Sequence, residues 1–202
     1  MNIANLKFSV ISGLIVTLIT SFQAIVIAPI LISSVGSSVY GAWIIVADVL
    51  IALQMFDFGI TAYGAQKIAS ARANDENHEC CANFFATMTI VIGLVILLNM
   101  LCIFVFLRYE FPAELSHASQ YILRNCAVIG IVSVSLQLLS YSFIAPSRAL
   151  ESLTVINVSS VCGALVGFLL TLVLLKMNFG LYSVAYGILI RSFLNLIGGV
   201  FS

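Results

Sequence analysis

Residues 8–47 read FSVISGLIVTLITSFQAIVIAPILISSVGSSVYGAWIIVA, and this stretch decides the fold class because it contains no charged residue. A helix needs about 20 apolar residues to cross the hydrocarbon core of a bilayer, so the stretch is long enough for two crossings. Small and polar residues interrupt it after Pro29, at Ser33–Ser38 around Gly36, and predict a turn there. We therefore expect the first span over about 8–32 and the second over about 40–62.

The rest of the chain repeats this pattern, with further spans expected over about 82–107, 125–145, 153–175 and 181–202. Hydrophobic residues make up 62% of the 202 residues and charged residues only 8%, and the mean hydropathy is +1.17. A soluble domain carries roughly 25% charged residues. The sequence therefore predicts an all-α membrane protein in which residues 1–202 form a single unit of about six transmembrane helices.

The same composition argues against several classes of function. The formal net charge is +0, so no basic field points to nucleic acid. No H-E-x-x-H or G-x-S-x-G motif is present, and we expect no enzyme. The five cysteines show no metal-binding spacing, so we expect neither a metal site nor a cofactor. The first apolar run, of about 25 residues, is too long for a cleavable signal peptide and predicts an uncleaved span.

The orientation follows from basic residues near the span ends, which favour the cytoplasmic side. If the N-terminus is cytoplasmic, four basic residues lie on the cytoplasmic side: Lys7, Lys67, Arg72 and Arg148. Three basic residues lie on the opposite side: Arg108, Arg124 and Lys176. This small excess predicts a cytoplasmic N-terminus. The polar segment Gln66–Glu79 is then expected to be a cytoplasmic loop.

Small and polar residues recur at steps of three and four in four of the expected spans, so that each set shares one helical face. The members are Gly13, Thr17 and Thr20; Gly130, Ser133, Gln137 and Ser140; Asn157, Ser160, Ala164, Gly167 and Thr171; and Gly187, Arg191, Asn195 and Gly199. Each stripe alone fits close helix packing through small residues. Four similar stripes together favour a shared polar interior, such as a hydrated cavity.

Three ionisable residues fall inside expected spans: Asp48, Asp57 and Arg191. A charge at the bilayer centre costs about 2.5–3.5 kcal/mol on insertion scales, so such residues usually face a bundle interior or a water-filled cavity. Asp48 fits either a cavity or proton-linked role or a buried structural pair, and Asp57 fits a structural hydrogen-bonding role near the interface. For Arg191 we weigh contact with phosphate oxygens against a structural or snorkelling role.

The segment 29–72 resembles the start of a known transporter family. It contains Pro29-Ile-Leu-Ile-Ser-Ser-Val-Gly36, Tyr40-Gly41-Ala-Trp43, Phe56-Asp57-Phe58-Gly59-Ile60 and Ile68-Ala69 in this order. This order resembles the bacterial polysaccharide flippases, the translocases of O-antigen and capsule repeat units. They belong to the multidrug/oligosaccharidyl-lipid/polysaccharide exporter superfamily.

The resemblance implies a function and a setting. Members of this family flip undecaprenyl-diphosphate-linked oligosaccharides across the bacterial cytoplasmic (inner) membrane, and they have roughly 12 or 14 spans in two lobes. Residues 1–202 would then be an N-terminal lobe and a fragment of such a protein. The implied partners are the lipid-linked oligosaccharide, membrane lipid, a polysaccharide polymerase and glycosyltransferases. The substrate or cavity residues would be Asp48, Asp57, Gln137, Asn157, Arg191 and Asn195.

Two alternatives stay open at this point. One is a cation-coupled multidrug antiporter of the same superfamily, in which Asp48 would bind the proton or sodium ion. The other is a membrane scaffold subunit without transport activity. Charges inside the spans argue against the scaffold, because a scaffold has no use for residues that are costly to bury.

Overall fold

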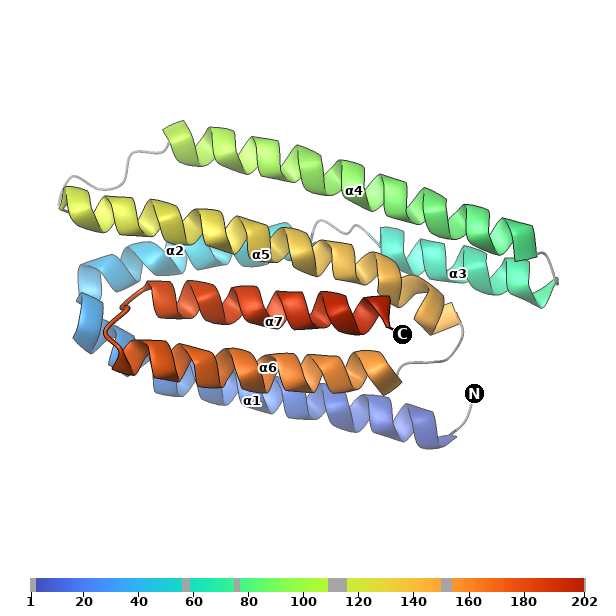
Figure 1. Ribbon diagram of the computed structural model, residues 1–202, viewed down its shortest axis with the longest axis horizontal. Helices are drawn as coiled ribbons and strands as arrows, with labels where there is room; N and C mark the ends of the chain where they lie inside the picture. Colours follow the sequence, from blue (N-terminus) through green and yellow to red (C-terminus); the bar gives the residue numbers. More distant parts are fainter. Residues whose placement is uncertain (1–2, 56–58, 75–76, 109–115, 150–153, 202) are drawn as a thin grey trace.

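The computed structural model describes residues 3–55, 59–74, 77–108, 116–149 and 154–201. Over these residues the protein is all-helical, with seven helices (Figure 1): α1 (Ile3–Val35), α2 (Ser37–Gln54), α3 (Ile60–Ala73), α4 (Asn77–Arg108), α5 (His117–Ala149), α6 (Thr154–Lys176) and α7 (Tyr182–Val200). All of them except α3 are long and apolar enough to cross a membrane. The prediction of an all-α, multi-pass membrane protein is confirmed.

The long helices lie roughly alongside one another and alternate in direction (Figure 1). Helices α1, α4 and α6 end at the end of the bundle where α2, α5 and α7 begin, and α3, α5 and α7 end at the opposite end, where α1, α4 and α6 begin. Apolar side chains cover the outside of the bundle. On α1, for example, Leu18 is 69% and Ile25 72% exposed. Such a surface suits lipid, because the hydrocarbon interior of a bilayer solvates apolar side chains.

The second expected span is wrong in its detail. We predicted one span over 40–62 and then a polar loop over Gln66–Glu79. In the structure α2 ends at Gln54, and a separate helix, α3, continues to Ala73. Gly59, directly before α3, has a φ of 76° in the left-handed region, which glycine adopts at little cost. The polar segment is helical because one face of α3 is buried: Thr61, Gly64, Ile68 and Ala71 are spaced by three and four residues, and α3 packs on α4 and α5.

The fourth span also begins earlier than the expected residue 125. Helix α5 starts at His117, and Ser116 precedes it. The backbone N–H of Ser119 donates a hydrogen bond to Ser116 Oγ at 3.2 Å. A serine that accepts such a bond satisfies one of the free N–H groups of the first helical turn. This cap allows the polar first turn of α5 to be helical outside the apolar stretch that we used to place the span.

Small residues hold the last two helices together. Among the described helices, α6 and α7 pack against each other most extensively, and Asn178 and Gly180 form the turn between them with positive φ angles. A Cβ atom added to Gly167 of α6 would lie only 2.8 Å from the carbonyl oxygen of Gly187 in α7. The small residues in these two stripes therefore serve close helix packing, as small residues commonly do in membranes.

Candidate functional site

A cavity that contains two charged side chains lies between α1, α2 and α7. Its volume is about 440 Å³, within the range of roughly 300–1,000 Å³ that is typical of small-molecule sites. We call it the α1–α2–α7 cavity. Its lining combines both signs of charge with amide, hydroxyl, aromatic and aliphatic groups: Thr20, Gln23, Ala24, Ile27, Ala28, Leu31, Tyr40, Trp43, Ile44, Ala47, Asp48, Ile51, Val184, Ile188 and Arg191.

The packing of the bundle explains why space remains there. α1 and α2 diverge from the turn at Gly36 (Figure 1), since α1 packs mainly on α6 whereas α2 packs mainly on α5. Gly36 is the single residue between the two helices. Its φ of 86° is a backbone conformation that residues with a side chain rarely adopt. α7 packs on both α5 and α6. The cavity is therefore a wedge between two diverging helices, with α7 contributing the third wall.

Asp48 reaches the cavity from the middle of α2. It lies eleven residues after Ser37, which begins α2, or about 17 Å along the helix at 1.5 Å per residue. A span beginning at Tyr40, eight residues before Asp48, would have placed it only about 12 Å along the helix; the depth is greater because α2 begins at Ser37. The opposite side of α2 is buried through Val46, Leu50 and Leu53. Burial of that apolar side turns the Asp48 side of the helix toward the cavity.

Arg191 reaches the same cavity from α7. It lies nine residues after Tyr182, the first residue of α7, or about 14 Å along the helix. Because α2 and α7 begin at the same end of the bundle (Figure 1), Asp48 and Arg191 lie at comparable depth. A Cβ atom added to Gly167 would lie 3.3 Å from Arg191 Cβ. The glycine in α6 thus leaves room for the base of the arginine side chain.

The two charged groups of the cavity, Asp48 and Arg191, have no side-chain partner in the described part of the chain. Among the described residues, no hydrogen bond or ion pair joins Asp48 or Arg191 to another side chain. The carboxylate is an acceptor of hydrogen bonds and the guanidinium a donor with planar geometry that matches phosphate or carboxylate oxygens. Both remain available to a bound molecule.

Gln137 and Asn195 meet each other and do not line this cavity. Asn195 Nδ2 donates a hydrogen bond to Gln137 Oε1 at 3.0 Å, which links α7 to α5. Gln137 Nε2 in turn donates to Ser140 Oγ at 3.3 Å. Two of the polar stripes therefore meet in a helix–helix contact. An amide pair of this kind stabilises membrane helices by about 0.6 kcal/mol on average.

Asn157 lies elsewhere, and Asp57 lies outside the described residues. Asn157 lines a second cavity of about 200 Å³ between α1 and α6, together with Ile11, Ser12, Ile15, Val158, Val161 and Cys162. Its Nδ2 atom is buried without a hydrogen-bond partner among the described residues. Of the six predicted site residues, the structure therefore places Asp48 and Arg191 in the lining of one cavity, and it brings Gln137 and Asn195 together in a separate contact.

Three residues of the cavity lining were not predicted from the sequence as site residues: Gln23, Tyr40 and Trp43. Gln23 could have been found, because it follows Thr20 by three residues and so continues the polar stripe of the first span. Tyr40 and Trp43 were noticed only for their family resemblance. Their position on the wall depends on how far α1 and α2 diverge, which periodicity within a single helix does not reveal.

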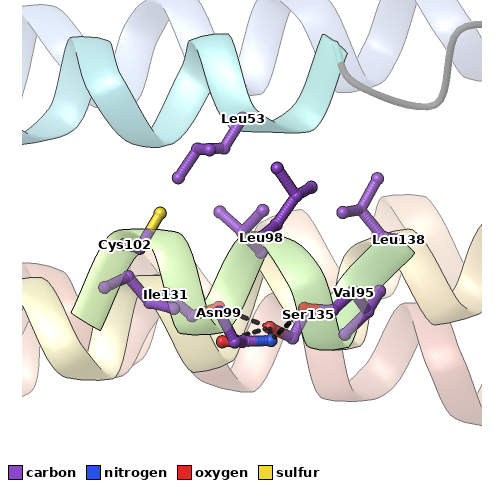
Figure 2. A pocket seen from close by; sticks show the side chains of 9 residues that line it. Leu53, Val95, Leu98, Asn99, Cys102, Ile131, Ser135 and Leu138 are labelled. Carbon is purple, nitrogen blue, oxygen red and sulfur yellow. Dashed lines mark hydrogen bonds between the residues drawn. The ribbon is translucent and has the colours of Figure 1, made fainter. Parts of the chain in front are cut away.

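A small void between α2, α4 and α5 holds another polar pair that we had not singled out (Figure 2). Asn99 Nδ2 lies 2.7 Å from Ser135 Oγ, and the Ser135 hydroxyl donates to the carbonyl of Ile131 at 2.8 Å. The void measures about 10 Å³, and apart from this pair its lining is apolar or sulfur-containing: Leu53, Val95, Leu98, Cys102, Ile131, Val134 and Leu138. This volume is about that of one water molecule, so the pair contributes to packing and forms no substrate site.

The comparisons with known proteins give no assignment, because no family model, curated protein or solved structure matches the chain. Within the described part of the chain, no group of three or more His, Cys, Asp or Glu side chains is arranged to hold a metal ion. The α1–α2–α7 cavity is therefore the feature that best supports a functional argument.

Proposed function

We propose that this protein is a lobe of a flippase that moves undecaprenyl-diphosphate-linked oligosaccharides across the bacterial cytoplasmic membrane. The observation that carries the proposal is the α1–α2–α7 cavity, where an unpaired arginine lies at mid-membrane depth. A scaffold protein has no use for such a cavity, since an ionisable group inside a membrane is costly and usually functional. The ordered residues between Pro29 and Arg72 that resemble the flippase family support the same choice.

The chemistry of flipping asks for no bond cleavage. The protein must shield the charged head group from hydrocarbon while the lipid tails stay in the bilayer. A wedge between diverging helices suits this task, because a head group can lie inside the wedge while its tails leave between α1 and α2. Arg191 would donate hydrogen bonds to the phosphate oxygens. Alternating exposure of the cavity to the two sides would complete transport.

A cation-coupled antiporter is the second candidate, and the observation that favours it is Asp48. Its carboxylate lies in the same cavity and is unpaired among the described side chains. A proton or sodium ion could bind there. The two candidates differ in which residue is indispensable: an antiporter depends first on Asp48, and a diphosphate flippase depends first on Arg191.

Export of surface polysaccharide in a flippase-null host tests the proposal directly. We expect the protein, expressed from its complete gene, to restore export, and Arg191→Gln to reduce the restored export at least about tenfold. Hydrogen bonds to charged groups contribute about 1.5–3 kcal/mol, and 1.4 kcal/mol corresponds to tenfold. Arg124→Gln is the matched control, because Arg124 is exposed on α5 away from the cavity. Wild-type export by Arg191→Gln, with normal amounts of protein in the membrane, would refute the proposal.

A further inference from the structure

Two opposite charges share the α1–α2–α7 cavity without neutralising each other. Asp48 and Arg191 lie on its wall at comparable depth, and neither has an ion-pair partner among the described residues. In a medium of low polarity the attraction between opposite charges is strong, so two such groups normally pair. Their separation in the cavity leaves one site for an anion and another for a cation on the same ligand.

A phosphate ligand alone fits this cavity poorly. Arg191 attracts phosphate oxygens, whereas the Asp48 carboxylate in the same cavity repels them, because like charges repel each other. Sugar hydroxyl groups can donate hydrogen bonds to the carboxylate, but they bring no charge that offsets this repulsion. An ammonium group on the saccharide would offset it.

The aromatic lining also suits a cation. Tyr40 and Trp43 line the cavity on α2, the helix that carries Asp48. Aromatic faces attract ammonium groups, and tryptophan does so most strongly. Across the cavity, α1 contributes Thr20 and Gln23, whose hydroxyl and amide groups can bond to neutral sugar hydroxyls. The carboxylate and the two aromatic side chains therefore line the cavity from the same helix.

We propose that the cavity selects an amino sugar with a free ammonium group, attached to phosphate, so that Arg191 holds the phosphate and Asp48 holds the ammonium group. This inference rests on the proposed function and narrows its substrate to a lipid-linked saccharide that carries charges of both signs. Asp48 is then a specificity-determining residue.

Binding of two sugar phosphates to the purified protein in lipid nanodiscs tests the inference. Glucosamine 1-phosphate carries the ammonium group, and N-acetylglucosamine 1-phosphate is its matched neutral analogue. We expect calorimetry to show that glucosamine 1-phosphate binds about tenfold more tightly than its neutral analogue. A tenfold difference in affinity corresponds to about one hydrogen bond to a charged group. Asp48→Asn should abolish this preference, and Arg191→Gln should weaken both probes. Glu79→Gln, at an exposed position on α4, should change neither.

The possible failures are distinguishable. If both probes bind equally, or if Asp48→Asn tightens both, Asp48 does not hold an ammonium group and the inference is wrong, while a loss of binding in Arg191→Gln still supports the phosphate role. If neither probe binds to the wild-type protein, the inference and the phosphate role of Arg191 both fail. Fluorescence of Trp43, the single tryptophan of the chain and a residue of the cavity wall, shows whether each variant is folded.

Discussion

Gly167→Ala is the substitution whose effect can be worked out most directly from the structure. The new Cβ atom would lie 2.8 Å from the carbonyl oxygen of Gly187, which is 0.6 Å short of the 3.4 Å at which ordinary contact begins. The obstacle is backbone, so α6 and α7 must move apart. Overpacking of this kind costs about 1–3 kcal/mol, and the better helix propensity of alanine offsets at most about 1 kcal/mol of it.

The matched control is Gly93→Ala in α4, where nothing lies within 4 Å of the added Cβ atom. It should be neutral or stabilise the protein by up to about 1 kcal/mol, the difference in helix propensity. Both variants can be unfolded by titration with SDS in mixed micelles, with the fluorescence of Trp43 as the signal. The two substitutions are chemically identical, so the difference between their free energies of unfolding reports the α6–α7 contact alone.

We expect Gly167→Ala to have the lowest free energy of unfolding. The value for Gly93→Ala should equal that of the wild type or exceed it. Gly167→Ala should also weaken binding of sugar phosphate, because the added methyl group would lie 3.3 Å from Arg191 Cβ and displace the side chain. If Gly167→Ala is as stable as Gly93→Ala, the close approach of α6 and α7 is wrong, and with it the placement of Arg191.

Two further predictions concern packing and orientation. A double-mutant cycle with Asn99→Ala and Ser135→Ala should give a coupling free energy of about 0.6 kcal/mol, the average for polar pairs between membrane helices; a coupling of zero in SDS unfolding would contradict the hydrogen bond at 2.7 Å. In a cysteine-free variant, Ser34→Cys should react with an impermeant thiol reagent on intact cells and Asn74→Cys should not, because the basic residues predict a cytoplasmic N-terminus. Labelling at 74 but not at 34 would reverse the orientation.

Hydropathy predicted the fold class because the tendency of a helix to enter a membrane depends on the residues of that helix alone. A stretch such as 8–47 must leave water wherever the rest of the chain lies, so its length and lack of charge were sufficient. The secondary structure was predicted wrongly where contacts between helices determine it. α3 is polar enough to be taken for a loop, and it is helical because Gly64 packs closely against Thr87 of α4, a contact between residues far apart in the sequence.

The candidate site was predictable only in part, for a related reason. The cost of placing a charge inside a membrane span pointed to Asp48 and Arg191 from sequence alone, and in the structure both line the same cavity. The stripes carrying Gln137 and Asn195 had the same periodicity, yet these residues bond to each other between α5 and α7. Periodicity shows that polar residues share a face of a helix, but it does not show whether that face meets a cavity or another helix.

Thiol accessibility on α2 shows whether the α1–α2–α7 cavity is a polar site inside the membrane. Ala47 lines the cavity, whereas Ile45, two residues away, is 56% exposed on the outer surface of the helix. In a cysteine-free variant we predict that Ala47→Cys reacts with a charged, water-soluble thiol reagent and that lipid-linked oligosaccharide protects it, while Ile45→Cys stays unreactive in lipid. Reaction at Ile45→Cys but not at Ala47→Cys would show that the outer face of α2 meets water and the cavity does not, and the cavity would then not be a polar site.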